Sequence, residues 1–228
     1  MSQDKKPFIL FTKYFQPPYL DSEGKDFDIE SYDFIQTQIF DSEKVKTQIY
    51  PDCQHFILTS ARSAKLISEF RLEGSFYCVG KTSEEILQNR GNNVIFTAPT
   101  AQELLNFIEI NIKLPTYFTF FCSQIRRDTI PDGLKQLGHH LHEITTYSTH
   151  SKSVEINKNY DAVAFFSPSG VKSYDEQYAI PEKAVIFAIG ETTAQAARKT
   201  FDRDVIFSKN ADLESLINLI KIHFNAKK

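Results

Sequence analysis

The stretches HFILTSARS (residues 55–63) and VAFFSPSG (residues 163–170) decide the fold of this chain, because they open two copies of one pattern. In each copy an apolar strand ends in hydroxyl residues. A second strand then ends in glycine followed by hydroxyl residues, and a third runs into a capped helix. The copies span residues 55–108 and 160–220, which makes each unit too long for a solenoid repeat. The pattern predicts two similar α/β lobes with hydroxyl-bearing turns between strands and helices.

Short runs rich in Phe, Ile and Val alternate with helical periodicity, which is typical of parallel sheets covered by helices. Five such strands are predicted between residues 56 and 147, but only three after residue 161. The N-terminal runs FILFT (8–12) and FIQTQIF (34–40) supply the pair that the last three strands lack. Each lobe is therefore expected to hold a five-stranded sheet.

This count predicts a discontinuous domain, residues 1–40 plus 150–228, with a second domain, residues 45–147, inserted in it. Two chain crossings between the domains are expected to form a hinge beside a cleft. Ligands of open α/β sheets bind beyond the carboxyl ends of the strands, where the repeated hydroxyls lie. The cleft is therefore the expected site.

The composition narrows the class of protein. With 228 residues, 41% of them hydrophobic, the chain can bury one large core or two modest ones, and its net charge of −3 gives no general attraction to nucleic acid or to anionic membranes. No apolar run reaches the length of a membrane span, and the N-terminus lacks the features of a signal peptide. Three widely spaced cysteines are expected to be reduced thiols of a cytoplasmic protein.

Several motifs of cofactor or nucleophile chemistry are incomplete. The GKTS at Gly80 lacks the glycine spacing of a phosphate-binding loop, and the SPSG at Ser167 lacks the first glycine of a nucleophile elbow. His139, His140 and His142 do not form a recognisable metal-ligand set with any Cys, Asp or Glu in the sequence. No dinucleotide fingerprint occurs, so neither a metal nor an organic cofactor is predicted.

The repeated hydroxyl turns remain as candidates. Any one of them is explained by helix capping, but six in matching places of two lobes favour an anion-binding cleft. Basic residues lie beside several turns, so a polyanionic small molecule is the expected ligand. The turns are Thr59–Ser60, Thr82–Ser83, Thr97, Ser167–Ser169, Thr192–Thr193 and Ser208, and the bases are Lys13, Arg62, Lys81, Arg126, Arg127 and Lys172.

The residues resemble the uroporphyrinogen-III synthase family. FFSPSGV (165–171) and FAIGETTAQAA (187–197) carry the resemblance, supported by ILTSARSA, CVGKTSEEIL and the RRDTIPDGLKQLG segment that leads to ITTYST. The resemblance implies two flavodoxin-like lobes joined by a two-stranded β linker. It also implies a hydro-lyase of haem biosynthesis that cyclises hydroxymethylbilane with loss of water and inversion of the last ring, without a cofactor.

The resemblance further implies the site residues. Tyr147 in ITTYST matches the functional tyrosine, which could act as a weak general acid or simply pack the hinge. The GKTS turn aligns in two ways, so Thr82 and Ser83 are not separated. The substrate-binding candidates are Thr12, Lys13, Ser60, Arg62, Thr82, Ser83, Ser167, Ser169, Gly170, Gly190, Thr192 and Thr193.

One segment departs from the family pattern, because residues 14–32 carry Pro17, Pro18 and many acids instead of an amphipathic helix. The rival hypothesis is a non-enzymatic two-lobed module that binds a tetrapyrrole or a polycarboxylate. Turnover would separate the two hypotheses. A monomer is expected in either case.

Overall fold

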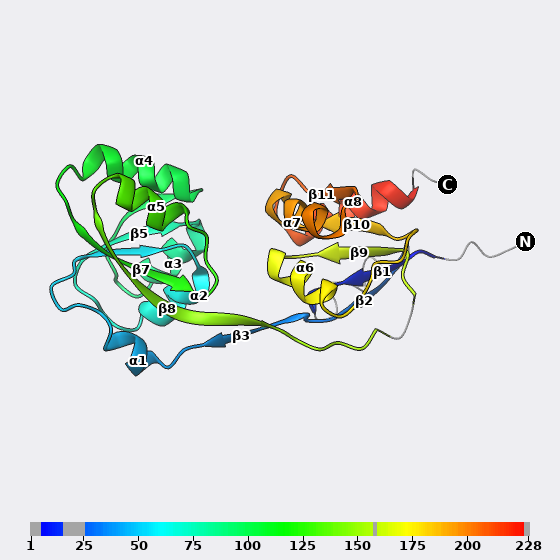
Figure 1. The fold of residues 1–228 in the computed structure, drawn as a ribbon, viewed down its shortest axis with the longest axis horizontal. Helices are drawn as coiled ribbons and strands as arrows, with labels where there is room; N and C mark the ends of the chain where they lie inside the picture. The colour runs from blue at the N-terminus through cyan, green and yellow to red at the C-terminus, as the bar shows by residue number, and fades with distance from the viewer. Residues whose placement is uncertain (1–5, 16–25, 157–158, 226–228) are drawn as a thin grey trace, which may run out of the picture. The chain divides into compact units, whose positions relative to one another are not determined.

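The computed structural model describes residues 6–15, 26–156 and 159–225. The chain divides into two compact units, Met1–Gln36 with His150–Lys228, and Thr37–Thr149 (Figure 1). Each unit is built on its own sheet. Most of the unusual 14–32 segment, including Pro17 and Pro18, lies outside the described residues.

The first unit holds a five-stranded sheet in the order β11-β10-β9-β1-β2, with every neighbouring pair parallel. The N-terminal part of the chain thus supplies the two strands on one side, and the C-terminal part supplies the other three. The strands are β1 (Phe8–Phe11), β2 (Asp28–Ser31), β9 (Ala162–Phe165), β10 (Val185–Ala188) and β11 (Val205–Phe207). The helices are α6 (Pro168–Asp175), α7 (Glu191–Phe201) and α8 (Leu213–Asn225).

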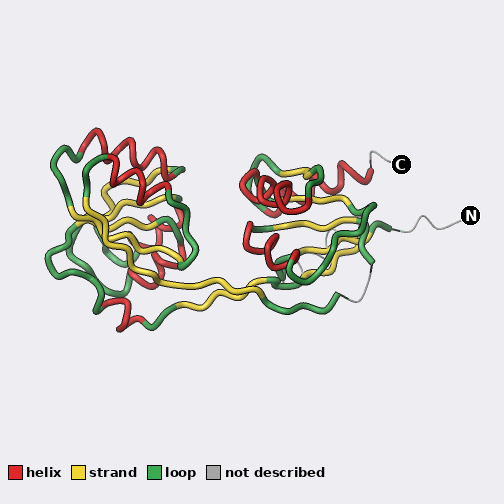
Figure 2. Tube along the Cα trace, viewed as in Figure 1, coloured by secondary structure: helices red, strands yellow, loops and turns green. Residues whose placement is uncertain are grey.

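Helices cover both faces of this sheet, because successive strand residues point to opposite sides. Leu10 packs with α6 and α7 around Tyr174, whereas its neighbours Ile9 and Phe11 pack with α8 around Leu216. Figures 1 and 2 show α6 and α7 on one side of the strands. The continuous apolar runs of these strands follow from burial on both faces.

The second unit holds a six-stranded sheet in the order β3-β8-β7-β4-β5-β6. Helices α2 and α3 pack on the face that carries Phe56 and Leu58, and α4 and α5 pack on the face that carries Ile57. The strands are β3 (Ile35–Ile39), β4 (His55–Leu58), β5 (Ser75–Val79), β6 (Val94–Ala98), β7 (Tyr117–Ser123) and β8 (His140–Ser151). The helices are α1 (Ser42–Lys46), α2 (Ala61–Ile67), α3 (Lys81–Gln88), α4 (Ala101–Asn111) and α5 (Thr129–Gln136).

The prediction that FIQTQIF completes the first sheet was wrong. Phe34 is buried in the core of the first unit, but β3, which follows it, is the sixth strand of the second sheet and lies beside β8. The first sheet is completed instead by β2, whose sequence DIES carries two acids. An edge strand needs little apolar surface, and charge discourages pairing with other chains. Hydrophobic periodicity therefore did not mark β2.

The two sheets are related by a circular permutation. The strands β11-β10-β9-β1-β2 occupy the same successive places as β6-β5-β4-β7-β8, although β1 and β2 come first in the chain and their counterparts β7 and β8 come last. The repeated sequences consequently fill equivalent places in the two units. In the second unit Leu58 of β4 pairs with Cys78 of β5, and Ser60 and Gly80 follow two residues later. In the first unit Phe165 of β9 pairs with Ala188 of β10, and Ser167 and Gly190 follow in the same way.

Candidate functional site

Three predicted residues meet at the carboxyl edge of the first sheet. Thr12 follows β1 and is buried, and its Oγ1 donates to the carbonyl oxygen of Ala164 at 3.1 Å. Ser167 begins α6, and its Oγ accepts from the Gly170 amide at 3.0 Å. A Cβ added at Gly170 would lie 3.3 Å from Ser167 Oγ and 3.5 Å from Thr12 Oγ1. Gly170 therefore lies close to both hydroxyls, and a larger residue there would crowd Ser167.

The neighbouring helix α7 begins without a side-chain cap. Its N-cap is Gly190, which has no side chain to accept a hydrogen bond from the first-turn amides. Thr192 is exposed in that turn, whereas Thr193 is 4% exposed and faces the core. Uncapped amides at the start of a helix attract anions, particularly beside an exposed hydroxyl. Ser169 is also exposed, in the first turn of α6.

The second unit repeats this arrangement. Ser60 caps α2 by accepting from the Arg62 amide at 3.2 Å. The start of α3, at Gly80, has no side-chain cap. Gly80 has φ +88°, in the region that favours glycine, and nothing within 4 Å would meet an added Cβ. Thr82 is exposed and Ser83 is only 2% exposed, so Thr82 is the hydroxyl that a ligand could reach.

Tyr147 and Arg62 are brought together in the second unit. The Arg62 guanidinium carbon lies 5.8 Å from the centroid of the Tyr147 ring, close enough for a cation–π contact. Tyr147 is half-buried on β8, and its carbonyl oxygen accepts from the Gln124 amide at 2.9 Å. The Tyr147 ring therefore lies beside a positive charge from the first turn of the helix that Ser60 caps.

A buried hydroxyl pair that the sequence analysis did not identify supports this arrangement. Ser63 Oγ and Thr146 Oγ1 lie 2.8 Å apart, and Thr146 Oγ1 donates to the Cys122 carbonyl oxygen at 3.0 Å. Alternation along β8 was a usable signal, because Thr146 lies between the inward-facing Ile144 and Ser148. The pair ties α2 to β8, next to Arg62 and Tyr147 in the sequence.

The other bases near the turns differ in availability. Arg126 makes hydrogen-bonded ion pairs with Glu143 and Asp128, so its charge is already compensated. The bonds to Glu143 raise the pKa of the guanidinium. Lys172 lies 3.8 Å from Glu176. Lys13 is exposed, with its Nζ 5.3 Å from the centroid of the Phe15 ring.

The three neighbouring histidines have separate surroundings. His140 stacks on Tyr117, and His142 packs against Tyr50 in a tilted arrangement, each pair with ring centroids 4.4 Å apart. His139 Nδ1 accepts from the backbone amide of Thr116 at 3.3 Å. Among the described residues, no group of three or more His, Cys, Asp or Glu side chains is placed to hold a metal ion.

A family model matches most of the chain. The model described as "Uroporphyrinogen-III synthase HemD" matches residues 34–218, well over half of the chain and both copies of the hydroxyl turns. The chain belongs to the uroporphyrinogen-III synthase family. It is accordingly an enzyme of haem biosynthesis, and the hydro-lyase class expected from the sequence fits the family. No curated protein sequence matches the chain significantly.

Solved structures of uroporphyrinogen-III synthases share this fold. A triple mutant of the enzyme from Thermus thermophilus matches with a TM-score of 0.72 and 12% identity, over 97% of this chain and 100% of the other. The enzyme from Helicobacter pylori matches with a TM-score of 0.68 and 13% identity, over 94% of this chain and 98% of the other.

In the described part of the chain, no helix has the length and apolarity needed to cross a membrane.

Proposed function

We propose that this member of the uroporphyrinogen-III synthase family cyclises hydroxymethylbilane, with loss of water and inversion of the last pyrrole ring. The observation that carries the proposal is the family match across residues 34–218. The test is to incubate chelator-treated protein with hydroxymethylbilane, oxidise the product and separate its isomers. Mainly type III product supports the proposal. Binding without turnover would favour the rival hypothesis of a non-enzymatic module.

The chemistry explains why the site contains hydroxyls and helix ends. Loss of the substrate's hydroxyl gives a reactive cation that closes spontaneously to the uninverted isomer. The enzyme's task is therefore to hold one conformation of a flexible octacarboxylate. Hydroxyls and helix-start amides suit carboxylates, because they supply hydrogen bonds without needing counter-ions.

We assign the carboxylate contacts to the exposed members of the turns. Thr82 and Thr192 each lie in the first turn of a helix that starts at an uncapped glycine, Gly80 or Gly190. Ser60 and Ser167 already cap helices, and each hydroxyl retains a hydrogen that it can donate. Ser83 and Thr193 are too buried for this role. The remaining proposed contacts are Lys13, Arg62 and Ser169, which are exposed. Thr12 and Gly170 are as buried as Ser83 and Thr193, so their proposed role is to position Ser167.

Tyr147 is the proposed general acid. Its phenol could donate a hydrogen bond to the departing hydroxyl, and the nearby Arg62 guanidinium would stabilise any negative charge that develops on the phenol oxygen. The alternative role is packing of the ring at the edge of β8. Replacement of Tyr147 by Phe distinguishes the two roles, because it removes only the oxygen.

We further propose that the two units are flavodoxin-like lobes joined by a two-stranded linker of β3 and β8. The first unit has the flavodoxin strand order, and the second is its circular permutation with β3 added. The second unit, Thr37–Thr149, is then an inserted domain that folds alone. A fragment of residues 37–149 should unfold cooperatively in urea. A fragment with no cooperative transition would contradict the proposal.

The protein is also proposed to be a cytoplasmic monomer. The three described cysteines, Cys53, Cys78 and Cys122, are all buried free thiols, as suits a reducing compartment. Burial raises the pKa of Cys122 to about 11 and that of Cys78 to about 12, so both stay protonated and unreactive near neutral pH. Sedimentation at several concentrations tests the monomer.

A further inference from the structure

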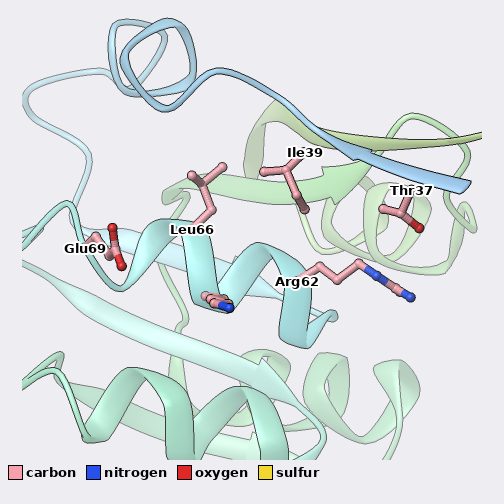
Figure 3. A pocket seen from close by; sticks show the side chains of 6 residues that line it. Thr37, Ile39, Arg62, Leu66 and Glu69 are labelled. Carbon is pink, nitrogen blue, oxygen red and sulfur yellow. The ribbon is translucent and has the colours of Figure 1, made fainter. Parts of the chain in front are cut away.

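A pocket of about 490 Å³ opens between β3 and α2 in the second unit. It is lined by Thr37 and Ile39 from the strand and by one side of the helix (Figure 3). Ile39 and Leu66 lie next to each other between the two elements in that view, and Arg62 extends toward the end of the strand that carries Thr37. Lys65 and Glu69 complete the lining.

The positive charges in this lining are not paired with the acidic residue of the same pocket. An oxygen of the Glu69 carboxylate lies 3.8 Å from the guanidinium of Arg90, which is not part of the lining, so this carboxylate already has a partner. Within the described ranges, neither Arg62 nor Lys65 has an acidic group within ion-pair distance. Both cations are therefore available to an anion that enters the pocket.

The apolar part of the lining is left partly exposed to solvent. Ile39 is 47% exposed although it is a large aliphatic side chain on a strand, and Leu66 is half-buried beside it. A ligand that covered these two side chains would remove apolar surface from water. The pocket thus combines an apolar wall with two cations, which suits a carboxylate carried on an apolar frame.

We propose that this pocket binds one pyrrole ring of the tetrapyrrole, with the ring against Ile39 and Leu66 and its carboxylate arm on Lys65. Arg62 links the pocket to the catalytic candidate, because its guanidinium also lies over the Tyr147 ring. This inference rests on the proposed function and adds a subsite to it. The cations select the carboxylate arm, and the aliphatic pair selects the ring.

The test uses two substitutions of opposite sign in the intact chain. Lys65→Met removes the charge and keeps the side-chain length, and should raise KM for hydroxymethylbilane about 3- to 10-fold while kcat falls less. Lys65→Arg should restore KM. Glu69→Gln makes the pocket more positive and should lower KM. Lys135→Met, on the exposed side of α5, is the matched control and should leave KM unchanged.

Equilibrium binding of uroporphyrinogen III under anaerobic conditions separates this inference from the proposed function. A larger Kd for Lys65→Met than for wild type supports the subsite, whether or not the protein produces the type III isomer. Equal Kd and KM in wild type, Lys65→Met and Glu69→Gln would overturn the subsite, even if the wild type makes type III product. An equal loss in the Lys135→Met control would also overturn it, because the effect would not be local.

Discussion

Loss of the buried Ser63–Thr146 hydrogen bond should destabilise the second unit by an amount that the structure allows us to estimate. Thr146 Oγ1 donates its single hydrogen to the Cys122 carbonyl, so Ser63 must donate the hydrogen of the 2.8 Å contact. The two residues are 0% and 1% exposed, which leaves no room for water to replace either partner. A group left without its partner therefore carries the full cost of its burial.

The two single substitutions should differ in cost. Ser63→Ala removes a donor, leaves the bond from Thr146 to Cys122 intact and should cost about 1 kcal/mol. Thr146→Val leaves the Ser63 hydroxyl without its partner and also removes the hydrogen bond to the Cys122 carbonyl, so it should cost about 2–3 kcal/mol. The double variant should lose about 1 kcal/mol less free energy of unfolding than the two single variants lose together, because it has no Ser63 hydroxyl to leave unpaired.

Urea denaturation of the four proteins measures this coupling. Thr146→Ser is the matched control, because it keeps the hydroxyl, and it should behave closer to wild type than Thr146→Val. Because Ser63 and Thr146 each adjoin a site residue, the destabilised variants should also lose kcat under conditions in which they stay folded. Additive free energies of unfolding, within about 0.3 kcal/mol, would refute the hydrogen-bonded pair.

Three further outcomes are expected. Tyr147→Phe should lower turnover about 10²-fold with nearly normal product binding if the phenol is the general acid, and unchanged turnover would remove it from that role. Gly133→Ala should lower the free energy of unfolding by about 1–3 kcal/mol, because the new Cβ would lie 2.3 Å from Leu105 Cδ1, and a more stable variant in thermal melts would show that Leu105 moves aside freely. The free energy of unfolding should fall as pH drops from about 7 to 5. Burial lowers the pKa of His55 in the folded protein, so the unfolded chain binds more protons in this range. A His55→Phe variant should show a flatter pH dependence in urea titrations.

Most of the fold was predictable from hydrophobic periodicity. The five strands expected between residues 56 and 147 correspond to β4–β8, and the three expected after residue 161 correspond to β9–β11. The error concerned the strands β2 and β3. DIES reads as a loop and IQTQI as a strand, but which sheet each joins depends on its partners rather than on its own propensity.

The site was predictable only as a set of turns. The repeat located Ser60 and Ser167, and helix capping, which explains any single turn, is what both serines do in the structure. The choice between Thr82 and Ser83 depended on the phase of α3, which Gly80 sets by ending β5 in a left-handed conformation. The contact of Arg62 with Tyr147 joins residues far apart in sequence, so no local pattern could have revealed it.

We infer that the protein imposes ring inversion on a substrate that closes spontaneously without it. The most direct measurement is the fraction of type III isomer formed from a fixed amount of hydroxymethylbilane as the concentration of wild-type protein is raised. The fraction should rise with protein concentration until nearly all product is type III. A product that stays type I at every concentration of folded protein would contradict the claim.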